Sequence, residues 1–187
     1  MNRLSAAHRS LGVLALSIGA VIILGVNATA RPPMVGSNDK KFVMKAAQGG
    51  AGEVMLGKLA IQNGSSPSVK AFGQHMVTDH SKANDTLKQT AARLGLSVPT
   101  TPGPEEKATY ARLSKLHGAA FDSAYKKDMI EDHHKDISEF QKEASTGKMP
   151  TLMHFAATTL PTLKSHLQMA EQMTIGGKMA PMHGMKM

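Results

Sequence analysis

The sequence predicts an all-α protein, an up-down four-helix bundle with one extra short crossover helix. Apolar residues recur at spacings of three and four in four long segments, which is the period of an amphipathic helix. Short turns rich in Gly, Pro, Ser and Asn separate these segments, and no segment alternates with period two. A motif of the form M-[VI]-x-D-H-x-K occurs twice, at 76–82 and 129–135. Long helices joined by short turns pack as antiparallel neighbours.

The N-terminus has the pattern of a secretory signal peptide over residues 1–30. Two arginines flank a polar start, an apolar run covers 11–26, and the small residues A-T-A follow at 28–30. The run is shorter than the roughly 20 apolar residues of a spanning helix. We therefore expect an exported protein of the periplasm or cell envelope whose leader is cleaved, with an uncleaved anchor as the alternative.

The remaining chain is expected to form one domain. Residues 31–38 are a linker, 39–175 the bundle and 176–187 a flexible tail, and the chain has no Cys. The formal net charge is +8, but the basic residues are scattered and only 4% of residues are aromatic. This pattern does not favour nucleic acid and is typical of a solvated basic surface, which could also contact anionic material of the envelope.

The first two helices are bounded by clear start and stop signals. A polar run ending at Asp39 can cap the first helix, and Asn63-Gly64 ends it. Ser66-Pro67 then places a capping side chain before a proline at the first helical position. The second helix is expected to run until Gly95.

The second half of the chain repeats this pattern after a loop over 96–104. A short helix is expected from Glu105 to His117, where Gly118 permits a break. A long helix follows to about residue 145. The last helix covers about 150–173, with Pro161 inside it as an expected kink.

Each long helix carries one polar residue at a core-facing position. These four residues are predicted to be metal ligands: Glu53, His80, His133 and His166. Counting 1.5 Å per residue from the turns places them at similar levels, although His166 lies about one and a half turns of helix further from its turn. Three aspartates are candidates for additional or supporting groups around the ion: Asp79, Asp122 and Asp132.

One carboxylate and three imidazoles are costly in a dry core and become favourable when they share a metal ion. The set has too few carboxylates for a di-iron centre built from E-x-x-H motifs. We therefore expect a mononuclear or irregular site for iron, manganese, zinc or copper. A polar layer without metal remains the alternative. Met76 and Met129 are expected to fill the core.

The tail is a second candidate metal site. Five soft or imidazole side chains are crowded there without helical period: Met179, Met182, His183, Met185 and Met187. Thioethers with one imidazole suit Cu(I). The alternative is a disordered end whose Met content has no function.

These motifs together resemble a family of exported bacterial proteins catalogued as a domain of unknown function and often labelled predicted outer membrane protein. The resemblance covers about 39–174 and rests on Glu53, the two D-H pairs and the L-P-T-L run at 160–163 followed by His166. It implies a ferritin-like four-helix bundle in the cell envelope, with no established activity.

Three functions are compatible with the sequence. The chain could bind a transition metal during metal or oxidative stress, act as a metal-free structural protein of the stressed envelope, or be a metal-dependent oxidase or peroxidase. Enzyme status stays open. No nucleophile triad, phosphate loop or nucleotide fingerprint is present, so the sequence does not favour a hydrolase or a nucleotide-dependent enzyme.

Overall fold

The computed structural model describes residues 34–175, which form five α-helices and no strand. This confirms the predicted all-α class. The helices are α1 (Ser37–Asn63), α2 (Pro67–Arg93), α3 (Pro104–Leu113), α4 (Gly118–Thr146) and α5 (Pro150–Gln172). The predicted leader lies outside the described residues, and α1 begins two residues before the predicted start of the bundle.

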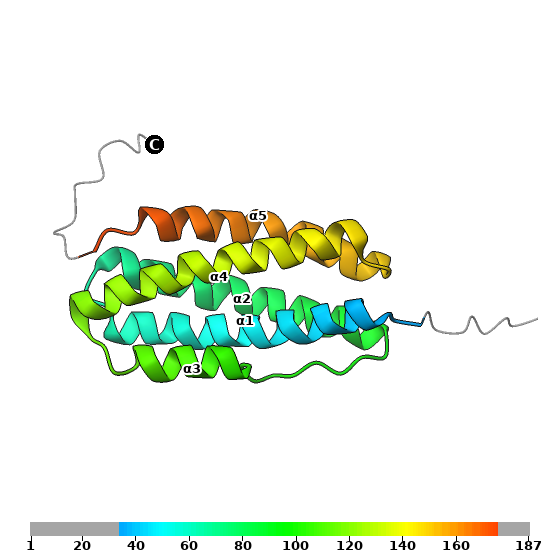
Figure 1. The fold of residues 1–187 in the computed structure, drawn as a ribbon, viewed down its shortest axis with the longest axis horizontal. Helices are drawn as coiled ribbons and strands as arrows, with labels where there is room; N and C mark the ends of the chain where they lie inside the picture. The colour runs from blue at the N-terminus through cyan, green and yellow to red at the C-terminus, as the bar shows by residue number, and fades with distance from the viewer. Residues whose placement is uncertain (1–33, 176–187) are drawn as a thin grey trace, which may run out of the picture. The chain divides into compact units, whose positions relative to one another are not determined.

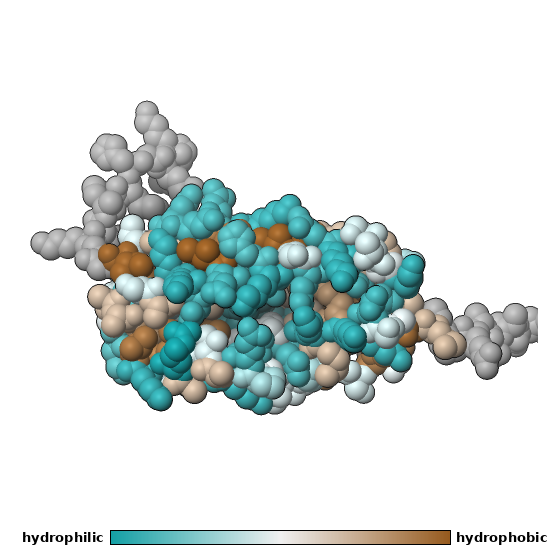
Figure 2. Space-filling view, viewed as in Figure 1, coloured by the Kyte–Doolittle hydropathy of each residue, from teal (hydrophilic) through white to brown (hydrophobic). Residues whose placement is uncertain are grey.

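The four long helices pack as two helical hairpins. α1 packs on α2 and α4 packs on α5, with α2 against α5 and α1 against α4 closing the bundle. The short helix α3 lies alongside α1, outside the four long helices (Figure 1). None of the helices in residues 34–175 is long and apolar enough to cross a membrane. The face seen in Figure 2 is mostly hydrophilic, with scattered hydrophobic residues.

Most helix ends follow the predicted punctuation. The Ser66 side chain accepts a hydrogen bond from the backbone N–H of Ser68, and Pro67 is the first residue of α2. Gly95 and Gly118 adopt positive φ angles of 70° and 59°, which glycine tolerates without strain. Pro161 lies inside α5, and the helix continues on both sides of it.

The short helix differs from its predicted extent because α3 ends at Leu113, four residues before His117. A tight turn follows, in which the backbone N–H of Leu116 donates to the carbonyl of Leu113. The side-chain amide of Asn63 then donates to the Leu116 carbonyl at 2.9 Å. This contact between distant parts of the chain favours the turn over another turn of helix.

The hydrophobic core has two parts, with polar residues between them. One cluster contains Met76 and Met129, confirming that these methionines lie in the core, and the other contains Leu87 and Phe140. Along each long helix the chain passes from one cluster to the other through a buried polar residue. These residues are Glu53, His80, His133 and His166. The core therefore contains a polar layer to which every long helix contributes.

Close helix packing brings α1 and α2 together near this layer. A Cβ atom added at Gly73 would lie 2.7 Å from the carbonyl oxygen of Gly57, and one added at Gly57 would lie 2.7 Å from that of Gly73. Real Cβ atoms do not approach backbone so closely, so both positions require glycine. The close approach fixes the first hairpin against which the other helices pack.

Asp122 anchors the turn between α1 and α2 to α4. Its carboxylate accepts hydrogen bonds from the Ser65 backbone N–H at 3.0 Å, the Ser65 hydroxyl at 2.6 Å and the Ser66 backbone N–H at 2.9 Å. The residue is fully buried. Asp122 therefore joins the two hairpins at this end of the bundle.

A pair of buried acids lies at the opposite end of the bundle. Asp39 accepts a hydrogen bond from the backbone N–H of Lys148 at 3.0 Å. Burial, and then the nearby Asp39, raises the pKa of Glu143 from its ordinary value of 4.5 to about 7. The folded protein therefore binds a proton at Glu143 more tightly than the unfolded chain does.

Replacing Glu143 with glutamine is expected to flatten the pH dependence of stability. Between pH 4.5 and 7 the wild-type folded state binds more protons than the unfolded state, so its stability falls as pH rises, by an amount on the order of 2 kcal/mol. The Glu143→Gln variant should lack this loss. Urea unfolding at pH 5 and pH 8 measures it. Glu131→Gln, at an exposed position of the same helix, is the control, and an equal effect in both variants would contradict the prediction.

Candidate metal centre

Three histidines from α2, α4 and α5 meet in the core. His80, His133 and His166 are 6%, 0% and 1% exposed. Their ring centroids are 5.3 to 6.0 Å apart. One ring nitrogen of each lies within 4.8 Å of one from each of the others. We call these residues the histidine triad.

Hydrogen bonding fixes the tautomer of His133. Its Nδ1 lies 2.8 Å from the backbone carbonyl oxygen of Met129, one helical turn earlier. A carbonyl oxygen can only accept, so Nδ1 carries the hydrogen in this contact. In the neutral ring the Nε2 atom then holds a lone pair, and this atom is buried without a hydrogen-bond partner.

His166 is oriented by a carboxylate in the same way. Its Nε2 lies 2.9 Å from Asp79 Oδ2. Because a carboxylate accepts, Nε2–H donates and the lone pair of the neutral ring lies on Nδ1. The Nδ1 atom of His166 and the Nε2 atom of His80 are both buried without partners. The triad therefore presents three buried ring nitrogens that no protein group satisfies.

The surroundings keep these rings neutral. Burial lowers the pKa of all three histidines, that of His80 well below its ordinary value and that of His133 to about 4. The other two rings lower the pKa of His80 further, while Asp79 partly offsets the lowering at His166. Phe72 packs edge-on against the rings of His133 and His166. Neutral imidazole is the form that binds a metal ion.

Glu53 lies in the same polar layer but belongs to a different group. Its carboxylate clusters with those of Asp132 and Asp136 from α4, with one oxygen of each within 4.8 Å of the others. Glu53 is 1% exposed, and neither of its oxygens has a hydrogen-bond partner. Burial, and then the neighbouring Asp132, raises its pKa well above the ordinary value. We call these three residues the carboxylate triad.

The two triads border a common space. A cavity of about 20 Å³, large enough for one water molecule, is lined by both His80 and Asp136. Asp132 directly precedes His133, so successive residues of α4 contribute to different triads, about 100° apart around the helix.

The three supporting aspartates have three different environments. Asp79 contacts His166, and Asp132 belongs to the carboxylate triad. Asp122 instead holds the turn between α1 and α2, about 16 Å along α4 from His133. The predicted tail ligands Met179, Met182, His183, Met185 and Met187 lie outside the described residues.

Two residues near the site were missed by sequence reasoning. Asp136 follows Asp132 by four residues, a spacing that places both on one helix face and could have identified it. Tyr125 is fully buried, and its hydroxyl has no hydrogen-bond partner. Its pKa is raised well above the ordinary value by burial and then by Glu53. Tyr125 gives no sequence signal beyond that of a core aromatic.

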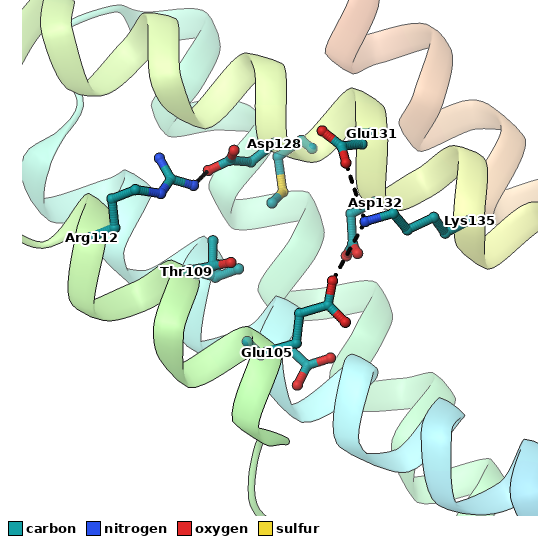
Figure 3. A pocket seen from close by; sticks show the side chains of 10 residues that line it. Glu105, Thr109, Arg112, Asp128, Glu131, Asp132 and Lys135 are labelled. Atoms are coloured by element: carbon teal, nitrogen blue, oxygen red, sulfur yellow. Dashed lines mark hydrogen bonds and ion pairs between the residues drawn. The ribbon is translucent and has the colours of Figure 1, made fainter.

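A surface pocket of about 210 Å³ borders the carboxylate triad at Asp132. Figure 3 shows it between α3 and α4, with Arg112 paired to Asp128 and Lys135 paired to Glu105 and Glu131. We call it the acidic pocket, because five of its ten lining residues are acidic. The lining consists of Leu56, Glu105, Glu106, Thr109, Arg112, Asp128, Met129, Glu131, Asp132 and Lys135.

The donor set of the histidine triad suits a transition metal. Imidazole nitrogen binds zinc, copper, iron and nickel. Around a tetrahedral ion at 2.0–2.1 Å from each ligand, neighbouring nitrogens are about 3.3 Å apart, so small ring movements from the present positions would complete the site. Three ligands leave one position of a tetrahedral ion open.

Comparison with known proteins identifies the family. Neither curated proteins nor solved structures gave a match. A family model described as "Domain of unknown function (DUF4142)" matches residues 24–173, which include all five helices and both triads. The chain therefore belongs to the DUF4142 family.

Proposed function

We propose that the protein binds a transition-metal ion, namely iron, manganese, zinc or copper, through His80, His133 and His166. One observation carries this proposal: one ring nitrogen of each histidine lies within 4.8 Å of one from each of the others, and each ring has a buried nitrogen without a hydrogen-bond partner. Leaving a buried polar atom unpaired costs about 1–3 kcal/mol. A metal ion would satisfy all three nitrogens at once.

The outer contacts of the rings favour metal binding over a purely structural polar layer. His133 and His166 each use one ring nitrogen in a hydrogen bond, to the Met129 carbonyl and to Asp79, and the other nitrogen is buried without a partner. Histidines that bind metals have this arrangement, in which the second nitrogen fixes the ring. A structural layer would be expected to pair the remaining nitrogens as well.

We further propose that this bundle is ferritin-like and works in the cell envelope, where it holds metal during metal or oxidative stress. The signal-peptide pattern of residues 1–30 supports export. A metal-dependent oxidase or peroxidase is the second candidate. The observation in its favour is that three protein ligands leave a coordination position open, as catalytic metal sites do.

The test is metal analysis of the protein expressed from the full chain and purified without a histidine-rich tag. After growth with iron, manganese, zinc and copper, we expect about one ion per chain at the histidine triad. The double variant His80→Ala, His133→Ala should lose it while circular dichroism shows a largely retained helix content. Cobalt(II) absorption supplies a second readout, because its visible bands report nitrogen ligands and thioethers of the tail bind this ion poorly.

A matched double variant controls for the loss of two imidazoles. His75 and His134 are exposed on α2 and α4, so His75→Ala with His134→Ala should keep both the ion and the cobalt spectrum. Folded wild-type protein without metal would contradict the proposal. An unchanged cobalt spectrum in the His80, His133 variant would do so as well, and collapse of the fold would favour the structural function.

A further inference from the structure

We propose that the carboxylate triad, Glu53, Asp132 and Asp136, is a second cation site, separate from the histidine triad. Its ligand would be a divalent cation that prefers oxygen, of the class of Mn²⁺ or Fe²⁺. The site goes beyond the metal site proposed above at the histidine triad, because it uses none of the same side chains. It can bind a cation whether or not the histidines bind one.

The geometry supplies three oxygen ligands from two helices. Glu53 comes from α1, and Asp132 and Asp136 stand one turn apart on α4. One oxygen of each lies within 4.8 Å of the others, so modest side-chain movement brings all three around one ion. Hard divalent cations bind such carboxylate sets, completing their shells with further oxygens.

Glu53 is the independent observation that indicates a ligand. It is 1% exposed, and both its oxygens are buried without a hydrogen-bond partner. The neighbouring Asp132 is itself an acid and raises the pKa of Glu53 further, so it supplies no compensating positive charge. A buried carboxylate requires a compensating group, and a bound cation supplies one.

Basic side chains in residues 34–175 compensate the triad only in part, through Lys45, which lowers the pKa of Asp136. Within residues 34–175, no ion pair includes a member of the carboxylate triad. The basic residues nearby pair with other acids: Lys45 with Glu139, Arg112 with Asp128, and Lys135 with Glu105 and Glu131. Burial raises the pKa of both Glu53 and Asp136, and the neighbouring Asp132 raises both further.

The acidic pocket gives a route from solvent. Asp132 lines the pocket and belongs to the triad, so the pocket reaches one of the proposed ligands (Figure 3). Glu106 lines the same pocket and packs against α1, where a Cβ atom at Gly52 would lie 2.3 Å from the Glu106 side chain. The excess of acidic groups at this entrance attracts cations.

The experiment is a Mn²⁺ titration of protein from the full chain after metal removal, with free Mn²⁺ followed by electron paramagnetic resonance. We expect a wild-type site whose affinity falls at least tenfold in Glu53→Gln and in Asp136→Asn. Glu143→Gln is the matched control, since it neutralises another buried acid, which lies near Asp39 at the end of the bundle. This variant should bind Mn²⁺ like the wild type.

The double variant His80→Ala, His133→Ala separates this proposal from metal binding at the histidine triad. The Mn²⁺ site should be retained in this double variant. If the histidine variant and the carboxylate variants each lost the same single site, the result would overturn the proposal in favour of one mixed site. Wild-type affinity in Glu53→Gln would also overturn it. The melting temperature gives a second readout. In the presence of chelator, Glu53→Gln should be at least as stable as the wild type. Added Mn²⁺ should raise the melting temperature of the wild type only.

Discussion

Replacing Asp79 with asparagine is expected to weaken metal binding at the histidine triad by about 10- to 100-fold. The Asp79 carboxylate can only accept from His166 Nε2–H, at 2.9 Å, and so holds the lone pair on the buried Nδ1 atom. An asparagine amide can also donate, which permits the opposite tautomer, and it removes the charge that makes the imidazole a better ligand. Competition with a chromophoric chelator measures the change.

The matched control for this variant is Asp85→Asn, at an exposed position of the same helix. It removes an equal charge, so it should leave metal affinity unchanged. Asp79 is itself half-buried, with 36% of its side chain exposed, and the metal-free Asp79→Asn protein should melt close to the wild type. Unaltered affinity in Asp79→Asn would mean that this carboxylate does not fix the ring.

Replacing Asp122 with alanine is expected to lower the free energy of unfolding by about 3–4 kcal/mol, or roughly 10 °C in melting temperature. The change removes an acceptor of three hydrogen bonds, two of them from backbone N–H groups of the turn between α1 and α2. The Ser66 donor would lie in a buried position without a partner. Thermal unfolding with chelator present measures the loss independently of metal.

Asp128→Ala provides the comparison on the same helix. Asp128 pairs with Arg112 across the surface, and exposed pairs contribute about 0–1 kcal/mol. We expect its melting temperature to stay within a few degrees of the wild type. Equal losses in the two variants would show that the buried hydrogen bonds of Asp122 add nothing beyond a surface charge.

The helices could be predicted because their signals are local. Ser66-Pro67, Gly95 and Gly118 act on the few residues around them, and each marks a helix boundary in the structure. The end of α3 was predicted incorrectly: a turn that includes a hydrogen bond from Asn63 to Leu116 follows Leu113 in place of further helix. No local pattern in the sequence encodes a contact across 53 residues.

The meeting of the three histidines could also be predicted, since counting residues from the turns gives each ring its level along the bundle. The carboxylate neighbours of Glu53 could not be predicted in this way. Several side chains share one level, and the rotation of each helix decides which of them touch. Asp122 shows that a shared helix face is not sufficient either. It lies on the same face as His133, but about 16 Å of helix separates the two residues.

Because the bundle consists of two hairpins, each triad contains residues from both of them. The first hairpin contributes His80 and Glu53, and the second contributes the other four ligands. An ion bound at either triad would therefore be a cross-link between the N-terminal and C-terminal halves of a chain that has no cysteine. Such a link closes a long loop and restricts the halves from separating, as a disulfide does, yet a chelator can reverse it.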